Sequence, residues 1–135
     1  MAAELVLNAD IHRSFQDDNL DLNRIEYLFK EAQLEGVSLD STSLEYSFRK
    51  ALERLAKRLA ADPSDIGVLQ GLEDATTLVS HLPFQVDLWR VQNICYEMLQ
   101  TVYGEYQMRA QQGQEEARTW LRHFNTIAQN LIVRV

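Results

Sequence analysis

The side chains with the strongest catalytic potential in this sequence are three histidines and one cysteine: His12, His81, His123 and Cys95. Di-iron helical proteins hold their metals with Glu-x-x-His pairs on facing helices, and zinc sites use closely spaced cysteine and histidine ligands. None of the three histidines has Glu or Asp three residues before it, and no His-x-x-x-His or Cys-x-x-Cys spacing occurs. The sequence therefore predicts neither a metal site nor a bound cofactor.

Nucleophilic and acid–base catalysis have equally little support. Cys95 lies between Val91 and Met98 in an apolar stripe at helical spacing, which predicts a buried, reduced thiol. No Gly-x-Ser-x-Gly motif or glycine-rich phosphate loop is present. Carboxylate doublets such as Glu73-Asp74 and Glu115-Glu116 point about 100° apart on a helix, which is typical of solvated faces. We expect no catalytic residue and no enzymatic activity of the chain on its own.

Two of the histidines have structural interpretations. His81 falls near the C-terminal end of an expected helix, where a cation interacts favourably with the helix dipole, so we expect it to cap that helix. His123 follows Arg122 on a helix face, and we expect it to be a surface residue.

One segment combines aromatic and amide side chains around a proline: Leu82-Pro83-Phe84-Gln85-Val86-Asp87-Leu88-Trp89-Arg90-Val91-Gln92-Asn93. Its candidate binding residues are Phe84, Trp89, Gln92 and Asn93. Because aromatic side chains dominate protein cores, we favour an interhelix joint held by Phe84 and Trp89, with the Trp89 indole packed against neighbouring helices. The alternative is a stacking platform for the apolar face of a sugar or for a partner's side chain. Gln92 and Asn93 need hydrogen-bond partners, either a neighbouring backbone or a ligand.

Helices must position these residues, because the 135-residue chain has only 5 Gly and 2 Pro and shows apolar residues at helical spacing throughout. We expect one domain over residues 1–135, an all-α antiparallel bundle of about five to six helices. The first helix should cover about 4–15 and end at Gln16-Asp17-Asp18-Asn19. The second should be capped by Asp21 or Asn23 and stopped by Gly36. The third should start near the capping box Thr42-Ser43-Leu44-Glu45. The fourth helix should begin at Asp62-Pro63, with Asp62 as its N-cap. Asp87 should cap the fifth helix, which Gly104 weakens and Gly113 ends. The last helix should bury Trp120 and be followed by a short tail, Val133-Arg134-Val135.

The charge balance restricts the partners. The formal net charge is -7 and the pI about 4.9, so we expect neither nucleic acid nor an anionic membrane surface as a partner. The basic residues concentrate in one stretch: Arg49, Lys50, Arg54, Lys57 and Arg58. Because Glu45 and Glu53 precede Arg49 and Lys57 by four residues, we expect ion pairs on a solvated helix face, with a weak anion-binding stripe as the alternative.

The expected location is the cytoplasm. A single cysteine excludes an internal disulfide and fits a reducing compartment. Glu4 and Asp10 interrupt the N-terminal apolar residues, so no signal peptide is expected, and no uncharged apolar run approaches the ~20 residues that span a bilayer.

The segment around Pro83 also carries a resemblance to known proteins. The pattern Leu-Pro-Phe-x-Val-Asp-Leu-Trp-x-x-Gln-Asn at 82–93, followed by Tyr96 and Leu99, resembles the helical C-terminal region of bacterial proteins whose N-terminal part is a glycoside hydrolase family 57 domain. Residues 21–39 and 51–56, with the Asp62-Pro63 break, are similar to the same region.

The resemblance implies a non-catalytic accessory module, because the family's catalytic carboxylates belong to a barrel domain that this chain does not contain. Its expected partners are the catalytic domain of the same parent chain and an α-glucan or oligosaccharide, with Trp89 facing the glucan. A module removed from its barrel should show one broad apolar patch. The alternative function is a free-standing helical interaction protein that binds a partner helix in a groove. A stand-alone hydrolase is a third hypothesis, disfavoured because no pair of positioned carboxylates is evident.

Overall fold

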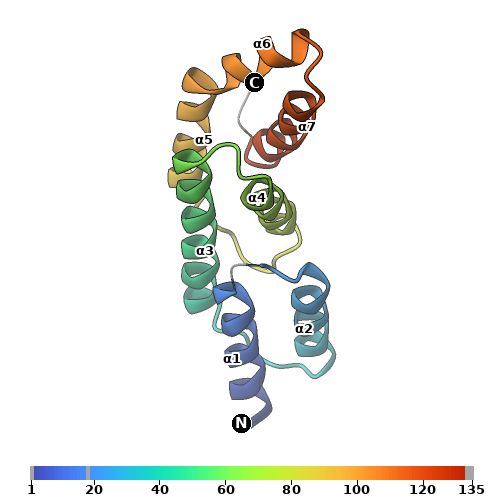
Figure 1. Ribbon diagram of the computed structural model, residues 1–135. Coiled ribbons are helices and arrows are strands. Elements are labelled where there is room, and N and C mark those ends of the chain that lie inside the picture. The colour runs from blue at the N-terminus through green and yellow to red at the C-terminus, as the bar shows by residue number, and fades with distance from the viewer. Residues whose placement is uncertain (1, 18, 133–135) are drawn as a thin grey trace.

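Every regular element in the part of the chain that the structure describes is an α-helix (Figure 1). The computed structural model describes residues 2–17 and 19–132, so the expected tail at 133–135 and Asp18 lie outside the described residues. Seven helices follow one another in the described ranges: α1 (Ala2–Gln16), α2 (Leu22–Leu34), α3 (Ser41–Ala61), α4 (Ile66–Val79), α5 (Trp89–Thr101), α6 (Tyr103–Gln111) and α7 (Glu115–Asn130). The all-α bundle is confirmed, whereas the expected count of five to six helices was too low.

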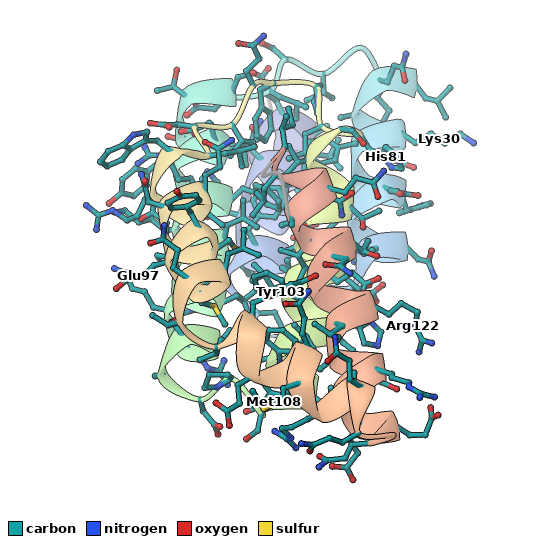
Figure 2. All side chains as sticks on the ribbon, turned by 90° about the horizontal axis from the view of Figure 1, so that it is seen from above. Lys30, His81, Glu97, Tyr103, Met108 and Arg122 are labelled. Atoms are coloured by element: carbon teal, nitrogen blue, oxygen red, sulfur yellow. The ribbon has the colours of Figure 1, made fainter. Side chains whose placement is uncertain are left out.

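The additional helix arises because the expected fifth helix breaks into α5 and α6. Val102 separates the two, and Gly104 lowers the helix propensity of the following turn. The break lets α6 pack on α7, and it buries Tyr103 and Tyr106 against that helix. Figure 2 shows Tyr103 between α6 and α7, where its hydroxyl lies 2.8 Å from the Asn125 side-chain oxygen.

The longest helix, α3 with 21 residues, is the support on which α1, α4 and α5 pack. Figure 1 shows α1 and α2 at one end of the molecule and α6 and α7 at the other, with α4 between them. The segment 80–88 leads from α4 to α5 through this middle region. None of the helices in the described ranges has both the length and the apolar character that crossing a bilayer requires.

Several helix boundaries lie where the sequence predicts them. The Asp21 carboxylate accepts a hydrogen bond from the Arg24 backbone N–H at 3.1 Å and so caps α2. Gly36 ends α2 with a φ of +65°, and the Val37 N–H donates to the Ala32 carbonyl at 2.9 Å. This arrangement is a Schellman motif, in which a left-handed residue satisfies the last carbonyls of a helix. The same motif ends α6 at Gly113, which has a φ of +87°.

Two predicted caps were wrong because neighbouring polar residues compete for the same role. Asp40, not the Thr42-Ser43 box, caps α3, and its carboxylate accepts from the Ser43 N–H at 3.3 Å. Asp62 is the C-cap of α3 rather than the N-cap of α4, which Asp65 caps through the Val68 N–H at 3.2 Å. The Asp65 N–H donates to the Asp62 carbonyl at 3.1 Å, so Asp-Pro-Ser-Asp forms a β-turn with proline at its second position.

Two aromatic clusters anchor the core. In the N-terminal half the Phe15 ring lies 5.1 Å from Phe48, and both side chains are fully buried. In the C-terminal half Trp120 is 1% exposed and stacks between Tyr106 at 3.9 Å and Phe124 at 4.9 Å, centroid to centroid. The buried stripe predicted for Trp120 is therefore confirmed.

Candidate functional site

The segment between α4 and α5 alternates its side chains like an extended strand. Leu82, Phe84, Val86 and Leu88 are half-buried and pack against the core, whereas Pro83, Gln85 and Asp87 are exposed. The Phe84 ring lies 6.2 Å from Phe29 of α2 in an edge-on arrangement. Phe84 therefore packs this segment against α2, whereas the sequence analysis expected it to hold α4 and α5 together with Trp89.

Trp89, by contrast, points into solvent, so the prediction that its indole packs against neighbouring helices was wrong. It is the first residue of α5, and its side chain is 70% exposed. The inward face of α5 is set by Val91, Cys95 and Met98, all buried. Trp89 precedes Val91 by two residues, which is about 200° around a helix, and the helical phase therefore places it on the outer face.

The side-chain amides of Gln92 and Asn93 both donate hydrogen bonds to backbone carbonyls. The Gln92 side-chain amide donates to the Leu131 carbonyl at the end of α7 at 2.8 Å, a link between α5 and the C-terminal helix. The Asn93 amide donates to the Trp89 carbonyl, also at 2.8 Å, within its own helix. The sequence left two kinds of partner open for these amides, a backbone group or a ligand. In the structure both amides donate to backbone carbonyls.

The outer face of α5 carries a short row of exposed side chains, defined here as the α5 outer face: Trp89, Asn93 and Tyr96. Their spacings of four and three residues place them on one side of the helix. Tyr96 is 54% exposed, so two aromatic rings with an amide between them face solvent. In Figure 2 the labelled Glu97 marks this outer side of α5, away from the rest of the bundle.

A polar cleft of about 580 Å³ lies beside the segment, between it and the first turns of α3. Its lining residues are Ser41, Thr42, Glu45, Arg49, Phe84, Gln85, Val86 and Asp87. Of the four predicted site residues, only Phe84 lines this cleft; Trp89, Gln92 and Asn93 follow on α5. The four predicted site residues therefore do not form one site: Phe84 lines the cleft, and the other three belong to α5.

Glu45 organises the cleft, and sequence reasoning had assigned it only to a capping box and an ion pair. Its carboxylate accepts from the Arg49 guanidinium at 3.1 and 3.2 Å and from the Asp87 backbone N–H at 3.0 Å. The hydrogen bond to Glu45 raises the pKa of Arg49. With its oxygens engaged in this way, Glu45 fastens the segment to α3, and the predicted Glu45–Arg49 pair is confirmed. The predicted cap at Asp87 was also wrong, because Leu88 is the N-cap of α5; the Asp87 carboxylate, one position earlier, accepts from the Trp89 N–H at 3.1 Å.

The second predicted ion pair of α3 was wrong. Glu53 lies 3.6 Å from Lys50, one turn before it, instead of pairing with Lys57. Glu53 is 5% exposed whereas Lys57 is exposed, so the two side chains lie at different depths on the helix.

Both histidine interpretations need correction. His81 lies beside α2 (Figure 2) and its ring nitrogen is 3.2 Å from the Glu26 carboxylate, so its side chain links the α4–α5 segment to α2 instead of capping α4. His123 is half-buried between α7 and α4, where it pairs with Glu73. Burial and the neighbouring Glu73 raise the pKa of Asp74, an effect that His123 opposes.

The remaining chemistry of the described residues is limited. No cluster of three or more His, Cys, Asp or Glu side chains in the described ranges has the geometry to hold a metal ion. Cys95 is fully buried, as predicted, and burial raises the pKa of its thiol to about 12. Such a thiol is protonated near neutral pH and is therefore a poor nucleophile.

No protein-family model, curated protein or solved structure matches this chain.

Proposed function

We propose that the chain is a non-catalytic helical module of a cytoplasmic, glycoside hydrolase family 57-like protein that acts on α-glucans. In this proposal the chain belongs to a larger parent protein, packs on its catalytic domain and supports it. The α5 outer face is the contact surface, either for that domain or for the glucan beside it. The sequence resemblance at 82–93 supports the family assignment, and the exposed aromatic residues of α5 support the contact.

The single observation that carries the proposal is the exposure of Trp89. A tryptophan that is 70% exposed leaves a large apolar ring in water, and tryptophan and tyrosine are enriched at binding surfaces. Tyr96 lies two turns further along the same face and adds a second ring. Two exposed rings with an amide between them suit the apolar face and the hydroxyls of a sugar chain, and also suit a neighbouring domain.

The carboxylates near this face support a non-catalytic role. Glu45 is engaged by Arg49 and by the Asp87 N–H, and Asp87 accepts from the Trp89 N–H. A glycosidase needs one carboxyl group as a proton donor and a second, about 5 Å or 6.5–9.5 Å away, as nucleophile or base. Here both carboxylates hold the α4–α5 segment in place.

Tryptophan fluorescence tests the proposal directly, because Trp120 is buried and Trp89 is not. The chain is titrated with maltoheptaose and, separately, with a purified family 57 catalytic domain. We expect a blue shift of the Trp89 emission with at least one of these probes and no shift in Trp89→Phe, which keeps Trp120. Tyr96→Ala keeps both tryptophans and should weaken the response, whereas Met108→Ala, an exposed apolar residue on α6, should not.

Two results would overturn the proposal. One is the absence of any Trp89 response to both probes. The other is hydrolysis of maltoheptaose by the pure chain that is abolished by Glu45→Gln, which would make the chain an enzyme.

The alternative function, a free-standing helical interaction module, has one observation in its favour. A groove of about 480 Å³ lies between α2 and α4, and its lining includes the apolar side chains Phe29, Ala32, Val37, Leu39, Leu78 and Pro83 beside the polar Glu26, Lys30, Gln33 and His81. An amphipathic partner helix could place its apolar face there. Hydrogen exchange separates the two functions: a partner in this groove should protect amides of α2 while leaving the Trp89 emission unchanged.

A further inference from the structure

A pocket of about 390 Å³ lies where the start of α4 meets the joint between α6 and α7, and its volume is within the range of small-ligand sites. Three apolar or aromatic side chains line it: Ile66, Tyr106 and Trp120. Ile66 is the first residue of α4 and is 41% exposed, whereas the two aromatic side chains are buried. We call this cavity the α4–α7 pocket.

The aromatic wall of the pocket is held in place by the core. The Tyr106 and Trp120 rings stack in parallel, with 3.9 Å between their centroids. The Trp120 indole N–H donates to the Pro63 carbonyl at 2.7 Å, and Pro63 precedes Ile66 by three residues. This hydrogen bond ties α7 to the start of α4, so the two sides of the pocket keep a fixed relation to each other.

Arg109 lines the pocket from α6 in a defined orientation. Its guanidinium carbon lies 5.0 Å from the Tyr106 ring centroid, and its Nε donates to the Gln114 side-chain oxygen at 2.9 Å. No carboxylate within residues 2–17 and 19–132 forms an ion pair with Arg109, although Glu105 precedes it by one turn. Because only Nε is engaged, the two terminal nitrogens remain available to a planar carboxylate.

The opposite charge comes from the first turn of α7. Glu115 and Glu116 both line the pocket, and Glu115 is paired with Arg118 at 3.0 Å. Glu116 is exposed and has no ion pair with any other described residue. The pocket therefore contains one cation, Arg109, and one carboxylate, Glu116, that no ion pair neutralises.

The placement of these groups defines the shape of a complementary ligand. Arg109 reaches Gln114, which precedes Glu116 by two residues, so both charges lie on the α6–α7 side of the pocket. The exposed apolar side chain, Ile66, lies on the α4 side. A complementary ligand carries an anionic and a cationic group at one end and an apolar body at the other.

We propose that the α4–α7 pocket binds a free α-amino acid with an apolar side chain. The ligand carboxylate accepts from the Arg109 guanidinium, the ligand ammonium donates to Glu116, and the apolar side chain packs on Ile66. The pocket shares no residue with the α5 outer face, so this binding is independent of the proposed function.

Nuclear magnetic resonance titration of the full chain with L-phenylalanine tests the site through the indole N–H signals of the two tryptophans. We expect a saturable shift of the Trp120 signal, because Trp120 lines the pocket, and no shift of the Trp89 signal. Phenylpropionate lacks the ammonium group and phenethylamine lacks the carboxylate. Each should bind roughly tenfold more weakly than L-phenylalanine, the usual loss for one charged hydrogen bond.

Two variants assign the two charges separately. Arg109→Gln should weaken L-phenylalanine and phenylpropionate by roughly tenfold and leave phenethylamine unchanged. Glu116→Gln should weaken L-phenylalanine and phenethylamine by a similar factor and leave phenylpropionate unchanged. The ligand that each variant still binds shows that its pocket remains folded. Arg122→Gln removes an exposed charge of α7 outside the pocket (Figure 2) and should leave all three affinities within about twofold.

Three results would overturn the site. The first is a Trp120 signal that does not shift, or does not saturate, with L-phenylalanine. The second is equal binding of L-phenylalanine and its two analogues, which would show that the charges are not read. The third is a loss in Arg122→Gln as large as that in Arg109→Gln, which would indicate charge screening and not a defined contact.

Discussion

The two tryptophans of this chain lie in opposite environments, although both belong to helices with clear apolar stripes. Trp120 of α7 is 1% exposed, stacks on Tyr106 and Phe124, and donates its indole N–H to the Pro63 carbonyl at 2.7 Å. Trp89 of α5 is 70% exposed and has no ring partner among the described residues. The Trp120 ring is therefore part of the core, whereas the Trp89 ring is exposed to solvent.

The comparison teaches that helical phase, not residue type, decides the role of an aromatic side chain. Trp120 is separated from Phe124 and Ile127 by four and seven residues, so all three lie on the buried side of α7. Trp89 lies two residues before Val91 and opposite the buried side of α5. Trp120 follows the general preference of aromatic residues for protein cores, and Trp89 does not.

The largest expected effect is that of Trp120→Ala. The substitution removes a fully enclosed ring and leaves the Pro63 carbonyl without its donor, so we expect a loss of about 3–5 kcal/mol in the free energy of unfolding. Urea denaturation followed by circular dichroism measures this loss. A loss below about 1 kcal/mol would contradict the buried stack and remove the contrast with Trp89.

The next effect concerns the buried side of α5. Burial raises the pKa of Cys95 to about 12 from an ordinary value of 9.0, so the native thiol stays neutral while the unfolded thiol ionises. The resulting stability is fully present below pH 9 and is lost as the pH rises from 9 towards 12, by about 1.4 kcal/mol per pH unit. Unfolding measured at pH 8 and pH 10 should show this loss in the wild type, in excess of the loss in Cys95→Ala.

Thiol labelling provides the matched control for that effect. Native Cys95 should react slowly with an alkylating reagent and rapidly after unfolding. A cysteine placed on the α5 outer face, Tyr96→Cys in a Cys95→Ala background, should react rapidly in the native protein. Equal native rates would mean that the two sides of α5 do not differ as the structure indicates.

The helices themselves were largely predictable, because amphipathic stripes carry strong periodic information. Their caps were less so: Asp40 and Thr42 compete for the start of α3, and Asp62 and Asp65 for the start of α4. Asp40 caps α3, and its backbone has a tertiary contact; Asp65 caps α4, at the end of the turn that begins at Asp62. The Asp40 N–H, for example, donates to Asn8 of α1 at 2.8 Å, a contact that local sequence does not reveal.

The candidate site was only partly predictable. Composition identified the segment 82–93, and counting two residues back from Val91 could have placed Trp89 on the outer face of α5. The clamp between Glu45 and the Asp87 N–H joins residues 42 positions apart, and the pair of Glu73 with His123 joins residues 50 positions apart. Such contacts depend on how the helices pack, which no local pattern in one sequence encodes.

A smaller effect is expected at the two neighbouring amides of α5, of which Gln92 is half-buried and Asn93 is exposed. Gln92→Ala removes the hydrogen bond to the Leu131 carbonyl and should cost about 0.5–1.5 kcal/mol. Asn93→Ala, one residue further, removes a bond to the carbonyl of its own helix at an exposed site and should cost less than about 0.5 kcal/mol. Denaturation curves of the two variants, recorded side by side, measure the difference. Equal costs would contradict the link from α5 to the end of α7.

The smallest expected effect, and the sharpest test of the comparison, is that of Trp89→Ala. The ring is exposed, and alanine is a better helix former than tryptophan at the first position of α5, so the free energy of unfolding should change by less than about 0.5 kcal/mol. Emission near the wavelength of an indole in water should disappear, while the Trp120 emission remains. A loss of about 3 kcal/mol or more would show that Trp89 is a core residue like Trp120. A stable variant that no longer responds to maltoheptaose or to the catalytic domain would instead tie the exposed ring to binding.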